Sequence, residues 1–343
     1  NRLEQVDFSI QLAPSSLVAY DKNKILAEDQ LLIEGEGGIA YRLTQRHIND
    51  TPDVILYSIG EAGMAGNEGF VYDLKSHRFI SETMRLFFRW DSRIVNSYLA
   101  DLRKHEPVRL RGITLSITKP CSDSYFHFIH ESLPAYLLLS EQFPKLKFDH
   151  LIINGAPSQF KKAWLQLAGI DLRKVVYTGY SSHHQCDQLL FLSDLCYHYS
   201  PNYLTTGLLQ KLRLKAKSEY RSGDYPKRII ASRKNAAIRR LEWEEELATV
   251  ADAAIVDFEK LSPADTIQIC DQCELFIGPH GAAFSNIVFC RPGTKVIEIA
   301  FGVHEVLYGR LASVCELDYL LFDVSQKDEL QTYLKSLSYS TVA

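Results

Sequence analysis

The feature that most constrains the fold of this chain is the alternation of short apolar segments with helical segments from about residue 110 onward. The apolar segments have the length and β-branched content of strands, whereas the stretches between them have the spacing of helices. Strands are predicted at residues 113–117, 151–153, 175–177, 189–192, 228–231, 254–256, 274–277 and 295–299. Helices are predicted at residues 161–168, 204–220, 241–251, 263–273 and 281–289. Because strands that alternate with helices form parallel sheets covered by helices, the chain is predicted to be an α/β protein.

The length of the chain, 343 residues, predicts more than one domain. A single hydrophobic core rarely serves more than about 250–300 residues. The best candidate for a linker is RSGDYP, at residues 221–226. We therefore expect two Rossmann-like domains that face each other, and a C-terminal helix that packs back on the first. The N-terminal domain is predicted at residues 1–222, with a β-rich part at 1–108 and a Rossmann-like part at 109–222. The C-terminal domain is predicted at residues 223–325 and the C-terminal helix at 326–343.

The net charge argues against polyanionic partners. The chain has 38 Lys and Arg residues against 42 Asp and Glu residues, a formal charge of −4, so no general field attracts nucleic acid. No apolar run reaches the roughly 20 residues of a membrane span, and the first residues do not resemble a signal peptide. The seven cysteines are an odd number, which favours reduced thiols and a cytoplasmic location. The alternative is the lumen of the ER or Golgi, if an N-terminal anchor has been removed; peripheral membrane association and oligomeric state stay open.

A glycine-rich stretch, GEAGMAGNEG at residues 60–69, lies between the apolar runs 54–59 and 70–72. A phosphate-binding loop would require a helix after it and a Gly-Lys-Ser/Thr sequence, and neither is present. The stretch therefore predicts a flexible β-hairpin. The cluster at residues 183–186, His-His-Gln-Cys, is predicted to be a loop.

The segment GPHGAAFSN, residues 278–286, is the most informative one for function. It follows a predicted strand and opens a predicted helix, so the amides of Gly281, Ala282 and Ala283 would point into free space beside His280. A helix N-terminus with unpaired N–H groups suits a phosphate, and ligands of open α/β sheets bind at the carboxyl ends of strands. The alternative is a tight turn that uses glycine for geometry alone.

A basic cluster in the same predicted domain favours an anion site. Arg233 and Lys234 follow the strand at residues 228–231, and Arg240 lies shortly after them. Guanidinium groups bind diphosphates through paired donors. Glu298 ends a later strand, at the kind of position from which a carboxylate accepts hydrogen bonds from ribose hydroxyls. Together these residues predict a nucleotide site, although a solvated basic surface is the alternative for the arginines.

The segment YFHFIHESLP, residues 125–134, contains a candidate general base. On a helix, which Ser122 or Asp123 would cap, His127 and Glu131 are four residues apart and share one face. A carboxylate beside an imidazole can remove a proton from a hydroxyl near neutral pH. A surface salt bridge or a core histidine is the alternative. Pro134 is expected to kink or end this helix.

The sequence does not predict a metal site. Cys270 and Cys273 have the spacing of half a zinc site, but they lie on the buried stripe of a predicted helix, and no second pair exists. The chain also has no Asp-x-Asp pair of the kind that binds a nucleotide diphosphate through a divalent metal. We therefore expect no metal and no cofactor.

Three segments resemble glycosyltransferase family 61, in the order found in that family. Residues 278–298, GPHGAAFSNIVFCRPGTKVIE, resemble its His-Gly-Ala-Gly signature with a later Asn, Pro-Gly and Glu, although Ala283 replaces the second glycine. Residues 228–247 resemble its Ser-Arg-Arg segment, and YFHFIHESLP is similar to its Tyr-Tyr-His-Trp motif. The resemblance covers roughly residues 55–300. It implies a GT-B architecture, inversion at the transferred sugar, and a bacterial capsule or polysaccharide enzyme.

These observations predict an inverting glycosyltransferase that moves a hexose or pentose from a nucleotide-sugar donor to a saccharide or glycoconjugate hydroxyl. We assign the catalytic base to Glu131, oriented by His127, with His127 itself as the other candidate. The donor-binding residues would be Arg233, Lys234, Arg240, His280, Gly281, Ala282, Ala283, Asn286 and Glu298. Two alternatives are a nucleotide-sugar-binding protein without catalysis and a nucleotide-sugar hydrolase or epimerase.

Overall fold

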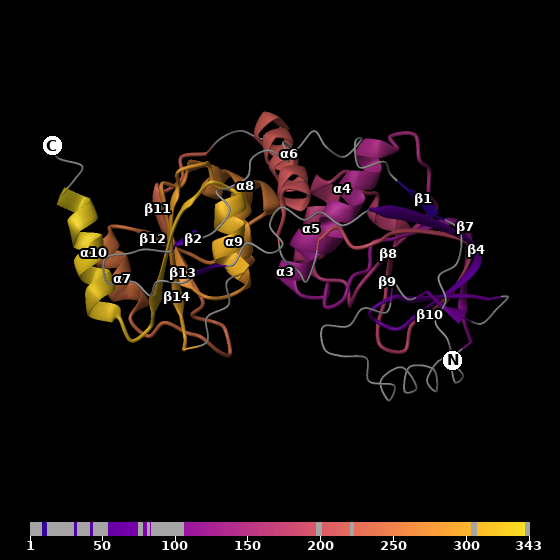
Figure 1. Cartoon of the computed structure of the whole chain (residues 1–343), viewed down its shortest axis with the longest axis horizontal. Helices are drawn as coiled ribbons and strands as arrows, with labels where there is room; N and C mark the ends of the chain where they lie inside the picture. Colours follow the sequence, from indigo (N-terminus) through magenta and orange to yellow (C-terminus); the bar gives the residue numbers. More distant parts are fainter. Residues whose placement is uncertain are drawn as a thin grey trace. The chain divides into compact units, whose positions relative to one another are not determined.

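The structure is a computed structural model that describes residues 54–74, 78–80, 83, 106–196, 201–219, 223–302 and 307–339, and three short strands (Figure 1). The short strands are β1 (Ser9–Gln11), β2 (Leu31–Leu32) and β3 (Arg42–Leu43). The chain divides into two compact units, one of Asn1–Asp21 and Thr51–Tyr199, the other of Lys22–Asp50 and Ser200–Ala343. Both units contain α-helices and a sheet with parallel strands, as the α/β prediction requires.

The first unit contains a mixed sheet in the order β6-β5-β4-β10-β7-β8-β9, with β1 paired to β4. Strands β10, β7, β8 and β9 run parallel, whereas β4, β5 and β6 add an antiparallel meander. The strands are β4 (Ile55–Ala65), β5 (Phe70–Asp73), β6 (Arg78–Phe79), β7 (Val108–Ser116), β8 (His150–Ile153), β9 (Val175–Tyr177) and β10 (His183–Leu192). The helical segments are α3 (Tyr125–His127), η2 (Phe128–Ser132), α4 (Leu133–Gln142), α5 (Gln159–Leu167) and η3 (Leu172–Lys174).

The glycine-rich stretch forms the predicted hairpin, but β4 continues through its first half to Ala65 and the turn occupies residues 66–69. Gly63 lies opposite Tyr72 on β5, and a Cβ at Gly63 would lie only 1.9 Å from the Tyr72 ring. Glycine is therefore required there because an aromatic ring crosses its strand. The loop prediction for residues 183–186 was wrong, since they are the first part of β10 and pair with both β4 and β7.

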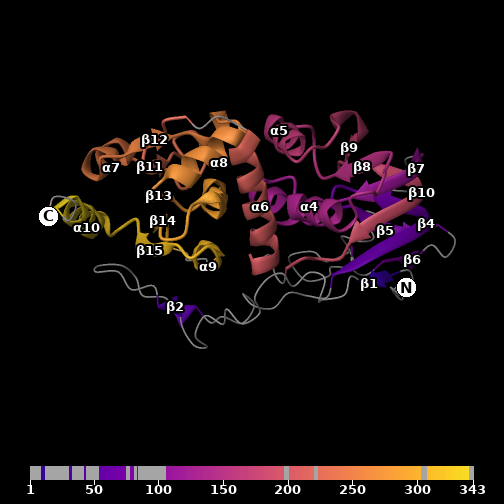
Figure 2. The same cartoon turned by 90° about the horizontal axis from the view of Figure 1, so that it is seen from above.

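The second unit contains a five-stranded parallel sheet in the order β12-β11-β13-β14-β15. The strands are β11 (Arg228–Ala231), β12 (Ala254–Val256), β13 (Leu275–Pro279), β14 (Lys295–Ala300) and β15 (Asp318–Asp323). The helices are α6 (Tyr203–Glu219), α7 (Glu244–Ala251), α8 (Pro263–Gln272), α9 (Leu307–Val314) and α10 (Lys327–Tyr339), with 3₁₀ segments η4 (Phe258–Lys260) and η5 (Ala282–Phe289). Helices α7 and α10 lie on one side of the sheet and α8 and α9 on the other (Figures 1 and 2).

Local sequence explains where several of these helices begin. Ser158 accepts a hydrogen bond from the amide of Lys161 and caps α5, and Ser262 caps α8 in the same way, with Pro263 at its first turn. Such a capping oxygen satisfies one of the unpaired amides of a first helical turn. No helix in the part of the chain that the structure describes has both the length and the apolar content to cross a bilayer.

The C-terminal helix α10 belongs to the second unit, which corrects the expectation that it packs on the N-terminal domain. Its residues Leu330 and Leu334 are buried in one core with Leu247 of α7. At the edge of this core, Lys327 forms an ion pair with Glu246, 2.5 Å between Nζ and Oε2.

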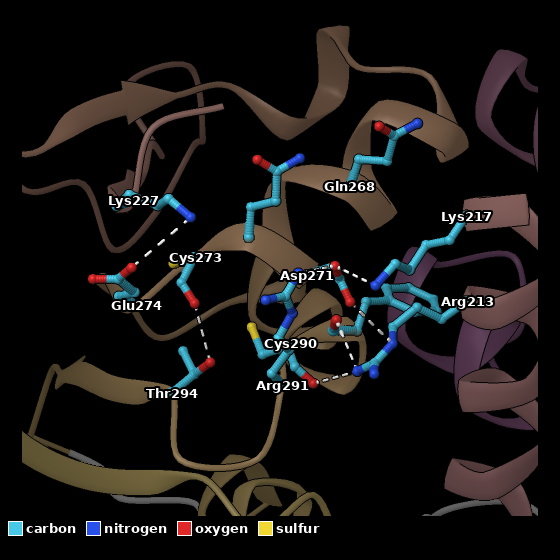
Figure 3. A network of polar contacts seen from close by, with 12 residues as sticks. Arg213, Lys217, Lys227, Gln268, Asp271, Cys273, Glu274, Cys290, Arg291 and Thr294 are labelled. Carbon is cyan, nitrogen blue, oxygen red and sulfur yellow. Dashed lines mark hydrogen bonds and ion pairs between the residues drawn. The ribbon is translucent and has the colours of Figure 1, made fainter. Parts of the chain in front are cut away.

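Helix α6 also belongs to the second unit, although the sequence analysis assigned it to the first domain. Asp271, at the end of α8, is almost completely buried and pairs with Lys217 of α6 at 2.7 Å and with Arg291 at 2.7 Å (Figure 3). Arg213 of α6 lies 3.4 Å from the same carboxylate and donates to the carbonyl oxygen of Cys290 at 2.7 Å. One carboxylate therefore joins α6, α8 and the segment after η5.

Candidate functional site

The two loops predicted to bind an anion meet at the carboxyl edge of the second sheet. One follows β11 and carries Arg233, and the other follows β13 and carries Gly281. A Cβ added to Gly281 would lie 1.8 Å from Nη1 and 2.5 Å from Cζ of Arg233. The guanidinium therefore lies directly against the Cα of Gly281. The backbone of Gly281 is extended, with φ 167°, so glycine is required there for space and not for its conformational freedom.

The guanidinium of Arg233 makes few hydrogen bonds to the protein. Its Nη2 donates to the carbonyl oxygen of Ile238 at 3.3 Å, and its buried Nε has no hydrogen-bond partner among the described residues. Burial, and then the charge of nearby Arg239, lower the pKa of Arg233, but an arginine stays protonated at any physiological pH. A half-buried donor without a partner costs free energy unless a ligand satisfies it. The geometry therefore favours an anion at this position.

The loop that carries Arg233 is held by Glu244, a residue that sequence reasoning missed. Glu244 is buried at the start of α7, where it accepts a hydrogen bond from the Ser232 hydroxyl at 2.9 Å and one from the Arg233 amide at 3.2 Å. The other two predicted cations point to solvent. Lys234 is exposed and pairs with Glu245 at 3.6 Å, and Arg240 is also exposed. Arg233 is thus the member of the basic cluster that lies against the glycine loop.

Glu298 lies in the interior of the second unit. Its side chain is fully buried, with Oε1 hydrogen-bonded to Nδ1 of His280 and Oε2 to the hydroxyl of Tyr319 on β15. The ring of His280 contacts that of Tyr308, whose hydroxyl donates to the carbonyl oxygen of Gly281 at 2.8 Å. This arrangement fits a carboxylate that orients His280 better than one that binds a ribose directly. Tyr308 and Tyr319 carry no motif that would have identified them in the sequence.

The helix predicted after Gly281 is a 3₁₀ helix, η5. Ala282 is exposed and Ala283 partly exposed, which leaves the backbone of this first turn open to a ligand. Asn286 is completely buried, so its side chain does not reach the open face of the turn. A 3₁₀ helix of this length supplies a weaker dipole than an α-helix, and the cation of Arg233 carries more of the electrostatic attraction.

The carboxylate–imidazole pair of the first unit forms as predicted. Nδ1 of His127 and Oε1 of Glu131 are hydrogen-bonded at 2.5 Å, with side chains 18% and 8% exposed. Burial, as the largest effect, raises the pKa of Glu131, and the hydrogen bond to His127 acts in the opposite direction. A raised pKa brings a carboxylate closer to the proton affinity that a general base requires near neutral pH.

The helix that carries this pair differs from the prediction. Its cap is Ser124 instead of Ser122 or Asp123, and Pro134 neither ends it nor interrupts α4. A π-helical turn, η2, precedes Pro134, and the helix continues past the proline although the proline has no backbone N–H to donate. Such turns are frequent at functional sites.

The buried thiols have a structural role. Cys270, Cys273 and Cys290 are buried in the second unit, in agreement with the expectation of core cysteines. Within the described ranges, no group of three or more His, Cys, Asp or Glu side chains has the geometry to hold a metal ion.

The structure therefore describes an α/β protein with two polar clusters. One is cationic and glycine-lined and lies at the carboxyl edge of the second sheet, and the other is a carboxylate–imidazole pair after β7 of the first unit. The family model of Glycosyltransferase 61 matches residues 125–297, about half of the chain. The chain therefore belongs to glycosyltransferase family 61, which confirms the resemblance and makes it a glycosyltransferase by family. No curated protein matches the chain. The matched region contains His127, Glu131 and Arg233 and ends one residue before Glu298.

Proposed function

We propose that this glycosyltransferase moves a hexose or pentose from a nucleotide-sugar donor to a saccharide hydroxyl, with inversion at the anomeric carbon. The observation that carries the proposal is the half-buried guanidinium of Arg233, held against Gly281 without an ion pair in the described part of the chain. A nucleoside diphosphate offers the charge and the paired acceptors that such a group binds. The departing diphosphate also develops charge during transfer, so the same group would stabilise the transition state.

The donor site would consist of Arg233, the backbone of Gly281, Ala282 and Ala283, and the ring of His280. Glu298 and Asn286 would support this loop from the interior, because both are buried. Lys234 and Arg240 would add to the local positive potential from the surface. We propose that these groups supply the charge that a divalent metal supplies in other transferases, so that chelators leave the activity unchanged.

The catalytic base would be Glu131, oriented by His127. Inversion requires one displacement, in which a base removes the proton of the acceptor hydroxyl as the sugar is transferred. Glu131 is the better candidate because it is the more buried member of the pair, whereas His127 holds it through the 2.5 Å hydrogen bond. His127 is the alternative base.

We further propose that the two units are the domains of a GT-B enzyme, and that the enzyme acts in the cytoplasm in polysaccharide biosynthesis, as bacterial capsule enzymes do. The free, buried thiols of Cys270, Cys273 and Cys290 support a reducing compartment.

Nucleotide binding tests the donor site. UDP, GDP, CDP and dTDP are titrated into the protein by calorimetry, and the tightest ligand is then titrated into Arg233→Ala. Lys227→Ala is the matched control, because it removes one positive charge from the same unit at an exposed residue paired with Glu274. We expect Arg233→Ala to weaken binding at least about tenfold and Lys227→Ala to leave it unchanged. Equal affinities of both variants and the wild type would refute the phosphate assignment.

Product analysis separates transfer from the other activities of a nucleotide-sugar enzyme. The corresponding nucleotide sugar is incubated with and without a mixture of saccharide acceptors, and the products are followed by NMR. We expect a glycosidic product of inverted configuration that forms only with an acceptor. Free sugar released at the same rate in both reactions would indicate a hydrolase, and a changed sugar still attached to the nucleotide would indicate an epimerase.

A further inference from the structure

The loop after β12 begins beside the loop that carries Arg233. Strands β11 and β12 are parallel neighbours with Ala231 opposite Val256, and the amide of Ser232 donates to the carbonyl oxygen of Val256 at 2.8 Å. Neighbouring strands lie about 4.8 Å apart, so the two loops leave the sheet side by side. Arg233 and Phe258 are each the second residue beyond the last strand pair. An anion bound by Arg233 therefore lies next to the loop after β12.

Phe258, the first residue of η4, places an aromatic ring in this loop. The ring stacks on that of Phe276 from β13, with 5.8 Å between the centroids and 22° between the planes. Phe276 is completely buried, whereas Phe258 is only partly buried. The ring of Phe258 is therefore fixed by the core and keeps part of its surface exposed at the carboxyl edge of the sheet. Such a ring is a surface on which a nucleobase can stack.

The aromatic layer below Phe258 also supports the glycine loop. Phe276 contacts Phe284 of η5, with ring centroids 5.2 Å apart. A Cβ added to Gly278 would lie 3.2 Å from the ring of Phe284, so that ring packs closely under the backbone at the end of β13. One layer of rings thus fixes Phe258 in relation to the loop that begins at Gly281.

The backbone around Phe258 is held in place by short-range contacts. Asp257 accepts a hydrogen bond from the amide of Glu259 at 3.2 Å and forms an ion pair with Lys260 at 2.8 Å. Ser262 then caps α8. A ring that is already ordered loses little further conformational entropy when a ligand stacks on it, so the stacking adds more fully to the affinity.

The order of the strands indicates the same direction for a nucleoside. In doubly wound sheets that bind dinucleotides, the strand after the phosphate-binding turn ends in an acid that binds the ribose. Here the strand that follows the Arg233 loop in the chain is β12, and the acids Asp257 and Glu259 come directly after it, Glu259 being exposed. Glu298, on β14, is buried and hydrogen-bonded to His280.

We propose that Phe258 is the stacking platform for the nucleobase of the donor, and that the nucleoside half of the donor lies over the loop after β12. The inference rests on the proposed function, in which Arg233 binds the diphosphate of a nucleotide sugar. Stacking accepts any base, since every base has a π-face, so Phe258 contributes affinity and orientation and does not select the base.

Calorimetry with and without a base on the ligand tests the inference. The tightest-binding of UDP, GDP, CDP and dTDP, and inorganic pyrophosphate, are titrated into full-length wild type, Phe258→Leu and Phe258→Tyr. We expect Phe258→Leu to raise the Kd of the nucleotide at least about fivefold, Phe258→Tyr to keep it near the wild-type value, and neither to change pyrophosphate binding. An unchanged nucleotide Kd in Phe258→Leu overturns the inference, as does an equal loss of pyrophosphate binding, which would indicate a purely structural role.

Tyr333→Leu is the matched control. Tyr333 is a partly buried aromatic residue of α10 in the same unit, and its ring contacts that of Phe322 with centroids 6.0 Å apart. The substitution therefore removes a ring with similar packing, and we expect the affinity for the nucleotide to stay at the wild-type value. A loss equal to that of Phe258→Leu would show that any such change in the core weakens binding, and it would overturn the assignment to Phe258.

A measurement on the wild type does not depend on how the variants fold. Nuclear Overhauser effects are recorded between the base protons of the bound nucleotide and protonated phenylalanine rings in deuterated protein, with the Phe258 signals assigned by their loss in Phe258→Tyr. Contacts between the base and Phe258 support the inference, and a bound base without them overturns it. If Arg233→Ala weakens nucleotide binding while Phe258 makes no contact, the proposed function stands and this inference fails. If none of the four nucleotides binds, the proposed donor site fails and the inference fails with it.

Discussion

Gly281→Ala should weaken nucleotide binding while it leaves the fold almost intact. The new Cβ would lie 1.8 Å from Nη1 of Arg233, a distance at which one of the two groups must move. The backbone of Gly281 is extended, so alanine introduces no conformational strain. The guanidinium is the end of a flexible side chain with one hydrogen bond, to Ile238, so it is the group that moves.

The size of the effect follows from the interaction that is lost. A hydrogen bond between charged partners contributes about 1.5–3 kcal/mol, which corresponds to an increase in Kd of roughly 10- to 150-fold. The free energy of unfolding should change by less than about 1 kcal/mol. The displaced guanidinium loses only one weak hydrogen bond, to the carbonyl oxygen of Ile238, and forms hydrogen bonds to water instead.

Calorimetric titration of the tightest-binding nucleoside diphosphate and urea unfolding measure the two quantities. The double variant Arg233→Ala/Gly281→Ala is the control, because an effect transmitted through Arg233 should be no larger in the double variant than in Arg233→Ala alone. The reasoning would be refuted by a Gly281→Ala protein that binds as tightly as the wild type, or by additive effects of the two substitutions.

Two further predictions concern the interior of the second unit. Asp271→Asn should lower the free energy of unfolding by about 1–3 kcal/mol, measured in urea, because it leaves the largely buried Arg213 and the more exposed Lys217 and Arg291 without their counter-ion. Although burial raises the pKa of Asp271, hydrogen bonds from Arg291 and Lys217 keep it below its usual value. The wild type should therefore have its full advantage in free energy of unfolding over Asp271→Asn above the unfolded-state pKa of about 3.9. This advantage should disappear as the pH falls through the lower pKa of the folded state, and an advantage that persists in acid would contradict the assignment. Tyr319→Phe should cost about 1–3 kcal/mol in the same assay, because one oxygen of buried Glu298 loses its donor, and an unchanged midpoint would argue against that bond.

The strand–helix alternation was the strongest signal in the sequence, and it predicted most of the second unit. Buried parallel strands are continuous apolar runs, so segments such as Arg228–Ala231 and Lys295–Ala300 are recognisable without any long-range information. The strand at His183–Leu192 was predicted only in its apolar half. Its first residues are polar, and they become a strand by pairing with β7 residues 76 positions away and with β4 residues more than a hundred positions away.

The sequence predicted the motif residues of the candidate site, but not the residues that hold them in place through hydrogen bonds. His127, Glu131, Arg233 and Gly281 carry chemistry in a recognisable spacing, and the structure joins them in two pairs. The partners of the Glu298 carboxylate did not follow from its position, because it is hydrogen-bonded to His280 and to Tyr319, a residue from the next strand. Glu244 and Tyr308 act through hydrogen bonds to residues distant in the sequence, which no local pattern records.

Transfer by Glu131→Gln is the most direct test of the account. With donor and acceptor identified, kcat is measured for the wild type and this variant, together with the affinity for the nucleoside diphosphate. Removal of a general base typically costs about 10²- to 10⁴-fold in rate, so we expect at least a hundredfold loss of kcat with unchanged nucleotide affinity. A variant that transfers sugar at close to the wild-type rate would contradict the assignment of Glu131 as the base.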